Sequence, residues 1–190
     1  MHKLLFATGN TRKIKEARDA CELVGIEITP IKLDIEEIQN IDGKKVAEHK
    51  AHQAYKILNK PVVVNDTYWE IPSLKGFPGP YMKDVQSWFT IKDWLALMAD
   101  KNKTTICHEN VVFADEHGRL HWFKKSFKGE FIDSPLGKIN NRNTPLERLV
   151  SFDGGKSTLA SLHDVGKNSY NPEDYCWVDF SKWYAAKYLC

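Results

Sequence analysis

The first 65 residues alternate between short continuous apolar runs and apolar residues at helical spacing. The runs Leu4–Ala7 and Pro61–Val64 predict buried strands, and the β-branched composition of the second is typical of a central strand. Helical spacing predicts one helix over 14–24 and another over 44–58. A further strand is predicted over 27–31, where its proline indicates an edge position.

The rest of the chain predicts further elements by the same rules. Helices are predicted over 85–89 and 91–98, and the strands 104–114 and 120–127 flank a hairpin-type turn. Alternation along the second of these strands places Trp122 and Phe123 on opposite faces. The pattern then weakens, and the remaining predictions are a strand over 146–152, a short helix from 157, and a last helix that starts at Asn171–Pro172.

Composition narrows the class of protein. The 190 residues carry a net charge of +2 with both signs interspersed, which argues against a nucleic-acid or membrane-binding surface. The four cysteines are far apart, so a zinc or disulfide framework is not indicated and a reducing cytoplasm fits best. The apolar part of the N-terminus is too short for a signal peptide, and no apolar run approaches the ~20 residues that span a bilayer.

The break between the first strand and the first helix carries the first candidate site. Thr8, Gly9, Asn10 and Thr11 form a small-residue turn at a helix N-terminus, which suits phosphate, and Lys13 can reach the same anion. Glu16 lies one turn further on, where it can hold a cation or orient Lys13. The alternative is a strand–helix connection with solvated charges. The local pattern by itself favours that alternative, because it lacks the glycine spacing of known phosphate loops.

Acids and lysines elsewhere give further candidates. The segment 33–39 is a strand end or an acidic loop, and Lys50 lies beside the apolar face of its helix. Asp66 follows the valine-rich strand, where α/β proteins bind ligands, although an aspartate there can equally cap the next turn. Lys83 leaves a Gly- and Pro-rich loop over 74–83. His108 and His121 are expected on the surface or across strands, with nothing pairing them as ligands.

Several of these separated segments, in order, resemble the Ham1-type nucleoside-triphosphate pyrophosphatases, also called inosine triphosphate pyrophosphatases. The matching segments are Thr8-Gly9-Asn10 with Lys13 and Glu16, Leu33-Asp34 with Glu37-Ile38-Gln39, Lys50-Ala51 with Ala54, Asp66-Thr67, and Gly76 with Pro78-Gly79-Pro80-Tyr81 and Lys83. Gly154-Gly155-Lys156, Thr158-Leu159-Ala160 and Lys167 match more loosely. The resemblance is therefore specific in the first half of the chain and weak in the second.

The resemblance implies a fold and a reaction. The fold is an α/β domain over 1–190, with an elongated mixed sheet flanked by helices, two lobes and a central cleft, in a homodimer. The reaction hydrolyses a nucleoside triphosphate to the monophosphate and pyrophosphate with Mg²⁺, or with Mn²⁺ in its place. Phosphates would contact Thr8, Gly9, Asn10, Thr11, Arg12 and Lys13, with Lys50, Lys83 and Lys167 as further contacts. Glu37, Asp66 and Glu16 would serve the metal, and Asp66 with Lys13 would carry the catalysis.

The chain departs from the family pattern at the residue before Asp66, which affects metal binding or catalysis, and in the segments that read the base. Asn65 stands where the family has Glu, so one carboxylate is lost. Asn141 to Pro145 and Ser169 to Asn171 replace the segments that contact a 6-keto purine. Tyr170 is a candidate to stack on a base and Asn171 to hydrogen-bond its edge, unless Asn171 only caps the last helix. An inosine- or xanthosine-type substrate, a relative with altered base preference, and a nucleotide-binding protein that has lost catalysis all stay open.

Overall fold

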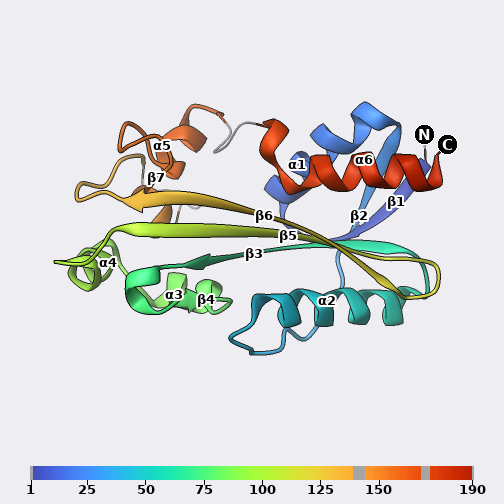
Figure 1. Ribbon diagram of the computed structural model, residues 1–190, viewed down its shortest axis with the longest axis horizontal. Helices are drawn as coiled ribbons and strands as arrows, with labels where there is room; N and C mark the ends of the chain where they lie inside the picture. Colours follow the sequence, from blue (N-terminus) through green and yellow to red (C-terminus); the bar gives the residue numbers. More distant parts are fainter. Residues whose placement is uncertain (1, 139–143, 168–171, 190) are drawn as a thin grey trace. The chain divides into compact units, whose positions relative to one another are not determined.

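The computed structural model describes residues 2–138, 144–167 and 172–189. Over these residues the chain forms a seven-stranded mixed sheet with six α-helices and four short 3₁₀ turns (Figure 1). This confirms the predicted mixed α/β fold. The strands are β1 (His2–Ala7), β2 (Ile26–Ile31), β3 (Val62–Glu70), β4 (Pro78–Gly79), β5 (Thr104–Ala114), β6 (Leu120–Phe131) and β7 (Val150–Ser151).

α-Helices connect β1 to β2, β2 to β3, and β4 to β5. The α-helices are α1 (Thr11–Cys21), α2 (Gly43–Leu58), α3 (Met82–Trp88), α4 (Ile91–Met98), α5 (Leu159–Asp164) and α6 (Cys176–Tyr188). The 3₁₀ turns are η1 (Glu22–Val24), η2 (Pro72–Leu74), η3 (Leu146–Arg148) and η4 (Pro172–Asp174). Among the described residues no helix has the length and apolar character needed to cross a membrane.

The strand order is β2-β1-β3-β5-β6-β7, and β4 also pairs with β3. β1 pairs in parallel with both β2 and β3, whereas β3–β4 and β6–β7 are antiparallel. β2 therefore lies at the end of the strand order, which confirms the edge position indicated by its proline. The register of β1 ends with Phe6 opposite Val63, so the residues of β3 after Val64 extend past the end of β1.

The chain divides into two compact units. The first comprises residues 1–67, 109–125 and 172–190, and the second comprises 68–108 and 126–171. Strands β3, β5 and β6 contribute residues to both units. Both candidate catalytic residues, Asp66 and Lys13, belong to the first unit.

The core of the first unit has two faces. On one face, α1 and α6 pack on Phe6, Val63 and Phe113 in a cluster that also includes Trp177. On the other face, three alanines of α2 pack against alternate valines of the same strands (Figure 1). Phe123 packs with the first cluster and Trp122 with the second, so the predicted opposite facing of these two residues is confirmed.

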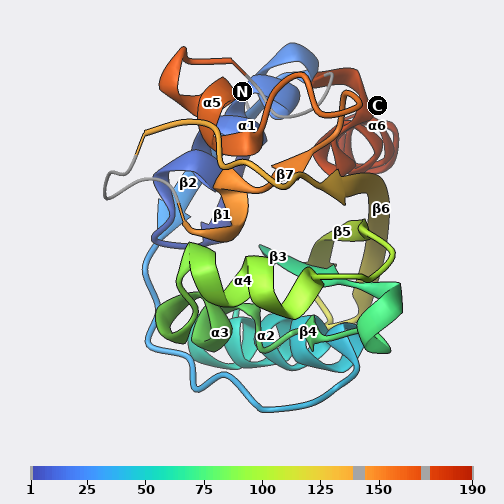
Figure 2. The same cartoon turned by 90° about the vertical axis from the view of Figure 1, so that its left-hand side faces the viewer.

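The core of the second unit is built around Trp94 of α4, the helix in the foreground of Figure 2. This side chain is fully buried, and its ring lies 5.0 Å from the ring of Phe89 and 5.8 Å from that of Phe131. Aromatic pairs at these separations are favourable beyond the area that they bury. The predicted helices over 85–89 and 91–98 are both present, as α3 and α4.

Two predicted boundaries near the candidate site are wrong. The strand expected to end before Asp66 continues to Glu70, because Tyr68 and Trp69 are good strand formers and Trp69 pairs with Gly79 of β4. Asp66 therefore lies inside a strand, just beyond the end of the neighbouring β1. The Gly- and Pro-rich loop over 74–83 is also shorter than expected, since it contains β4 and runs into α3 at Met82.

Two later boundaries differ as well. The strand expected over 146–152 is a 3₁₀ turn followed by the two-residue β7. The last helix begins at Cys176, five residues after the expected start, because Tyr175 has an extended backbone (φ −63°, ψ 144°) that separates it from the preceding 3₁₀ turn. Asn171, the expected cap, lies outside the described residues.

Candidate active site

The turn after β1 is closed by its own polar side chains. The side-chain oxygen of Asn10 accepts hydrogen bonds from the backbone N–H groups of Arg12 (2.9 Å) and Lys13 (3.3 Å), which caps α1. The hydroxyl of Thr8 accepts from the N–H of Asn10 at 3.1 Å. Two backbone N–H groups of the first helical turn are thus already hydrogen-bonded to Asn10. An anion at this helix end would therefore be bound mainly by side chains.

Lys13 brings a positive charge from α1 to the middle of β3. Its ammonium donates to the backbone oxygen of Asn65 at 3.2 Å, which leaves two further N–H groups on the same nitrogen. Burial lowers the pKa of Lys13, the nearby Asp66 carboxylate raises it, and the positive charge of Lys50 lowers it again. Asp66 itself is half-buried. The fold therefore gathers Lys13, Asp66 and Lys50 within electrostatic reach of one another.

Lys50 links this group to the acidic loop. From α2 its ammonium lies 3.2 Å from a carboxylate oxygen of Glu37, and its side chain is only 19% exposed against 44% for Glu37. The segment around Glu37 is a loop, which is one of the two predicted readings.

Glu16 lies one turn after Lys13 on α1. It pairs with Arg12 at 3.8 Å, and burial raises its pKa to about 7 against the opposing effect of the Arg12 charge. Burial therefore disfavours the ionised form of this carboxyl, which is the form that binds a cation. Its expected metal role stays a prediction.

The sequence pattern missed one acid beside this group. Glu109 of β5 is buried, accepts a hydrogen bond from the N–H of Cys176 at 2.9 Å, and is hydrogen-bonded by the Asn65 side chain. It lies between His108 and Asn110, where a polar triplet interrupts the apolar residues of the strand, and no local motif marks it. Only the alternation of β5 would have indicated it, as a charge on the core-facing side of the strand.

The remaining predicted contacts lie elsewhere in the chain. Lys83 is exposed at the start of α3, and Lys167 is exposed after α5; both belong to the second unit. Tyr170 and Asn171, the candidate base contacts, lie outside the described residues, as do Asn141 to Asn143. The predicted role of each of these residues stays a prediction.

The two histidines have specific partners. His108 is buried, and its two ring nitrogens lie 2.9 Å from the Glu70 carboxylate and 2.7 Å from the Ser126 hydroxyl. Of the two predicted positions, surface or cross-strand, His108 takes the cross-strand one, and these two hydrogen bonds satisfy its ring inside the second unit. His121 lies 3.0 Å from the fully buried Asp115 carboxylate at the turn between β5 and β6.

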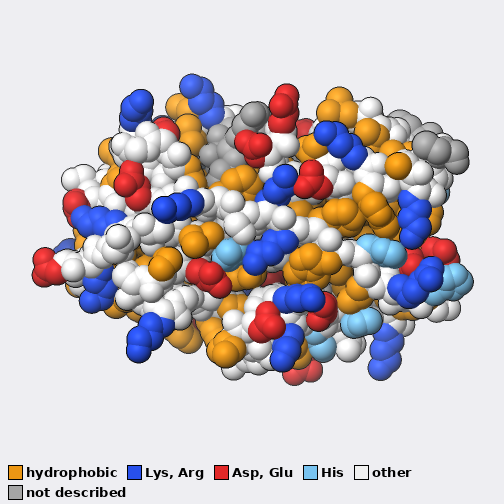
Figure 3. All heavy atoms as spheres, viewed as in Figure 1, with side chains coloured by type: hydrophobic (Ala, Val, Ile, Leu, Met, Phe, Trp, Pro, Cys, Tyr) orange, Lys and Arg blue, Asp and Glu red, His pale blue; other side chains and the backbone are white. Residues whose placement is uncertain are grey.

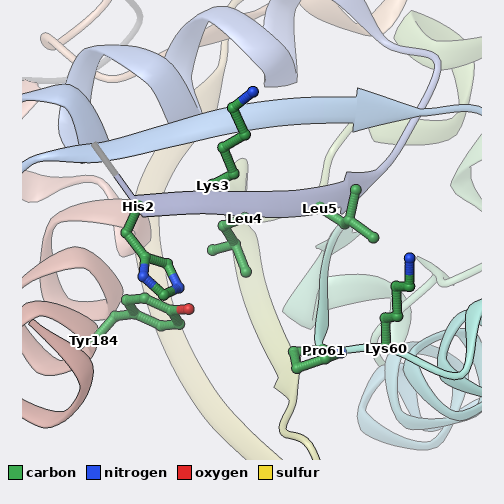
Figure 4. A pocket seen from close by; sticks show the side chains of 7 residues that line it. All are labelled: His2, Lys3, Leu4, Leu5, Lys60, Pro61 and Tyr184. Atoms are coloured by element: carbon green, nitrogen blue, oxygen red, sulfur yellow. The ribbon is translucent and has the colours of Figure 1, made fainter.

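A cavity of about 190 Å³ in the first unit does not coincide with the candidate site. It is lined by His2, Lys3, Leu4, Leu5, Lys60, Pro61 and Tyr184. Figure 4 shows that these residues come from the start of β1, the segment before β3 and α6, with the rings of His2 and Tyr184 side by side. The candidate phosphate contacts lie after the opposite end of β1.

Metal ligands are also sparse among the described residues, which contain no group of three or more His, Cys, Asp or Glu that could hold an ion by itself. Glu37 and Asp66 nevertheless provide hard carboxylate oxygens of the kind that Mg²⁺ prefers. A Mg²⁺ ion that binds with substrate phosphates needs only one or two protein carboxylates. The donor set therefore fits a metal that enters together with its substrate.

The protein is thus a mixed α/β protein in which Lys13 of the first helix lies within electrostatic range of Lys50 and of the half-buried Asp66. The profile of the Ham1 family matches residues 4–177, and the chain belongs to the Ham1 family. This confirms the resemblance seen in the sequence.

Individual relatives match over nearly the whole chain. A dITP/XTP pyrophosphatase of Methanosarcina mazei is 34% identical over 185 residues, covering 97% of this chain and 98% of the relative. An inosine triphosphate pyrophosphatase of Candida glabrata is 29% identical over 189 residues, covering 95% and 96%. Among solved structures, a HAM1 protein from Coxiella burnetii has a TM-score of 0.80 at 20% identity, covering 98% of this chain and 100% of that one, which supports the fold alone.

Proposed function

We propose that this protein is a nucleoside-triphosphate pyrophosphatase that acts on non-canonical purine nucleotides of the inosine or xanthosine type. The enzyme class follows from membership of the Ham1 family, in which the relatives above are named as pyrophosphatases. One observation supports the proposal for this chain most strongly. Beyond the end of β1, the charged groups of Lys50 and Asp66 both lie within electrostatic range of Lys13.

In the proposed reaction, lysine side chains neutralise phosphate charge and an aspartate acts on the attacking water. Water attacks the α-phosphorus, the bond from that phosphorus to the oxygen bridging to the β-phosphate breaks, and pyrophosphate leaves with the electron pair. Negative charge develops on the leaving group, so cations that contact the β- and γ-phosphates stabilise the transition state. Lys13 and Lys50 fill this role in our proposal, with Thr8 to Arg12 around the same phosphates and Lys83 and Lys167 as further contacts.

Asp66 acts on the attacking water. It is half-buried beside Lys13, and in our proposal its carboxylate orients the water and accepts a proton from it. General-base catalysis of this kind contributes roughly 10²- to 10⁴-fold to a rate.

We further propose that Asp66 and Glu37 hold Mg²⁺, or Mn²⁺, together with the substrate. When bound, the cation supplies charge neutralisation at the phosphate oxygens. Before substrate enters, the Lys50 ammonium occupies one side of Glu37 and compensates its charge. Glu16 completes the set of expected ligands.

Base recognition in our proposal depends on two segments that differ from the family pattern. The segments that differ from the family pattern, Asn141 to Pro145 and Ser169 to Asn171, fall mostly outside the described residues. We therefore propose a purine preference that is weaker than in the relatives, with Tyr170 and Asn171 as base contacts. On the family resemblance we also propose a homodimer, and on the scattered cysteines we propose a cytoplasmic location.

Pyrophosphate release tests this function directly. Inosine, xanthosine, adenosine, guanosine and pyrimidine triphosphates, in ribose and deoxyribose forms, are incubated with and without Mg²⁺. We expect Mg²⁺-dependent release of pyrophosphate and the monophosphate, fastest with inosine or xanthosine forms. Saturable nucleotide binding without release from any triphosphate would instead support the nucleotide-binding alternative.

A further inference from the structure

Glu109 is a charged residue at a position where the fold places apolar side chains. It is 6% exposed and precedes Val111 and Phe113, which point to the same face of β5 and belong to the cluster between the sheet and α1 and α6. A valine at this position would continue that face. Because a buried carboxylate is costly unless it is hydrogen-bonded, its partners should explain its presence.

The first partner is the N-terminus of α6. The N–H of Cys176 donates to a Glu109 carboxylate oxygen at 2.9 Å, whereas Tyr175, the residue at the N-cap position, makes no side-chain capping bond. Glu109 therefore caps α6 from a strand 67 residues earlier in the chain. A negative charge at this helix end also interacts favourably with the helix dipole.

The second partner is Asn65, the residue next to Asp66. Its side-chain amide hydrogen-bonds the Glu109 carboxylate and also donates to the backbone oxygen of Asn110 at 3.1 Å. The backbone oxygen of Asn65 in turn accepts the bond from the Lys13 ammonium. A continuous set of contacts thus runs from the start of α6 through Glu109 and Asn65 to Lys13.

The charges of this group are coupled as well. The pKa of Glu109 is raised overall, because burial outweighs the Cys176 N–H and the positive charge of Lys13, which both act to lower it. Lys13 therefore lies within electrostatic range of the Glu109 carboxyl group. Lys13 also experiences the like charges of Lys50 and Arg12. When Glu109 is ionised, its negative charge near Lys13 reduces the repulsion among these cations before any phosphate arrives.

We propose that Glu109 is a positioning residue for phosphate binding: it fixes Asn65 and the start of α6, and it supplies the buried negative charge that keeps Lys13 in place for the substrate phosphates. This inference rests on the proposed function and adds a residue to it. It also offers a reason for Asn65: where the family has a glutamate at this position, Glu109 of the adjacent strand β5 supplies a carboxylate in its place.

Inorganic tripolyphosphate is the probe for the first experiment, because it carries the phosphates without a base. Glu109→Gln keeps the shape of the side chain and an oxygen for the Cys176 N–H, and removes only the charge. We expect it to weaken tripolyphosphate binding in calorimetry, and to raise KM, by about tenfold, as expected for losing one charge-assisted hydrogen bond. The value of kcat should change by less than about threefold, since Asp66 is untouched.

Asp115→Asn is the matched control. Asp115 is also a buried acid that accepts backbone N–H groups at an end of β5, but it lies at the turn away from Asp66 and Lys13. We expect it to lower the melting temperature without changing tripolyphosphate binding, measured well below the melting temperature. Equal weakening in both variants would mean that stability, and not charge, controls binding, and would overturn the proposal.

A charge exchange gives the sharper test. Asn65→Asp by itself places two carboxylates side by side and should weaken binding, whereas Asn65→Asp combined with Glu109→Gln returns one carboxylate to the pair. We expect the double variant to bind tripolyphosphate within about threefold of the parent, better than either single variant. A double variant no better than Glu109→Gln would overturn the charge role.

The remaining outcomes are also decisive. If Glu109→Gln does not fold, Glu109→Met, which fills the site without polar atoms, replaces it. Failure of both to fold while Asp115→Asn folds would assign Glu109 a purely structural role. Unchanged binding in Glu109→Gln would refute the proposal, whereas a parent protein that neither binds tripolyphosphate nor releases pyrophosphate from any triphosphate would refute the proposed function itself.

Discussion

Replacing Lys13 by Met tests the phosphate role most directly. The methionine keeps most of the length and apolar volume of the half-buried lysine stem and removes the ammonium that contacts the Asn65 oxygen at 3.2 Å. The free energy of unfolding should change by less than about 1 kcal/mol, because the variant loses one hydrogen bond but no longer keeps a partly desolvated charge. A fall in activity therefore cannot be attributed to unfolding, and the melting temperature checks this.

The expected magnitude follows from the bond that is lost. A hydrogen bond to a charged group contributes about 1.5–3 kcal/mol. With about 1.4 kcal/mol for each factor of ten, kcat/KM should fall roughly 10- to 150-fold. Because the ammonium contacts phosphate and not base, the same factor should apply to every triphosphate.

Steady-state pyrophosphate release with inosine, xanthosine and adenosine triphosphates measures this factor. Lys15→Met is the matched control, since Lys15 lies on the same helix but is exposed and pairs with Asp19. We expect the control to stay within about twofold of the parent. The reasoning fails if Lys13→Met loses less than threefold, if its loss is confined to one base, or if Lys15→Met loses as much.

Four further outcomes are expected. Asp66→Asn should lower kcat by at least about 100-fold with an unchanged melting temperature, and turnover within a few-fold of the parent would remove its assigned role. Lys83→Ala should raise KM or lower kcat alike for every triphosphate, and a change restricted to one base would contradict a phosphate contact. Although burial acts to raise the pKa of Asp115, hydrogen bonds from His121 and from the backbone of His117 and Arg119 hold it well below its usual value. A depressed carboxyl pKa stabilises the folded state above the unfolded pKa of about 3.9 and loses this effect at lower pH, so Asp115→Asn should lower the urea midpoint at pH 7 by an amount that shrinks below about pH 4. Finally, selectivity for inosine over adenosine triphosphate should be weaker than in the Methanosarcina mazei relative assayed alongside, and equal or stronger selectivity would show that other residues read the base.

Local features of this protein were accessible from the sequence alone. These features depend on residues only a few positions apart, so the sequence pattern is enough to predict them. They are the turn from β1 into α1, the capping position of Asn10, and the helix α2. The edge position of β2 and the opposite facing of Trp122 and Phe123 were accessible for the same reason, because strand alternation and the missing N–H of proline are local properties. The family resemblance added Lys50 and Glu37 to the candidate set, and the fold brings these two into contact.

Other features of the site were decided only by the tertiary structure, because they depend on contacts between residues that are distant in the chain. The length of β3 was set by the pairing of Trp69 with Gly79, which placed Asp66 inside a strand, and past the end of β1. In the sequence Glu109 is one of three consecutive polar residues, His108 to Asn110, and nothing there indicates its partners. In the fold, β5 lies beside β3, and Cys176, 67 residues away, donates its N–H to the Glu109 carboxylate. A buried charge is stable only with partners that compensate it, and the sequence does not reveal those partners because strand order and helix packing choose them.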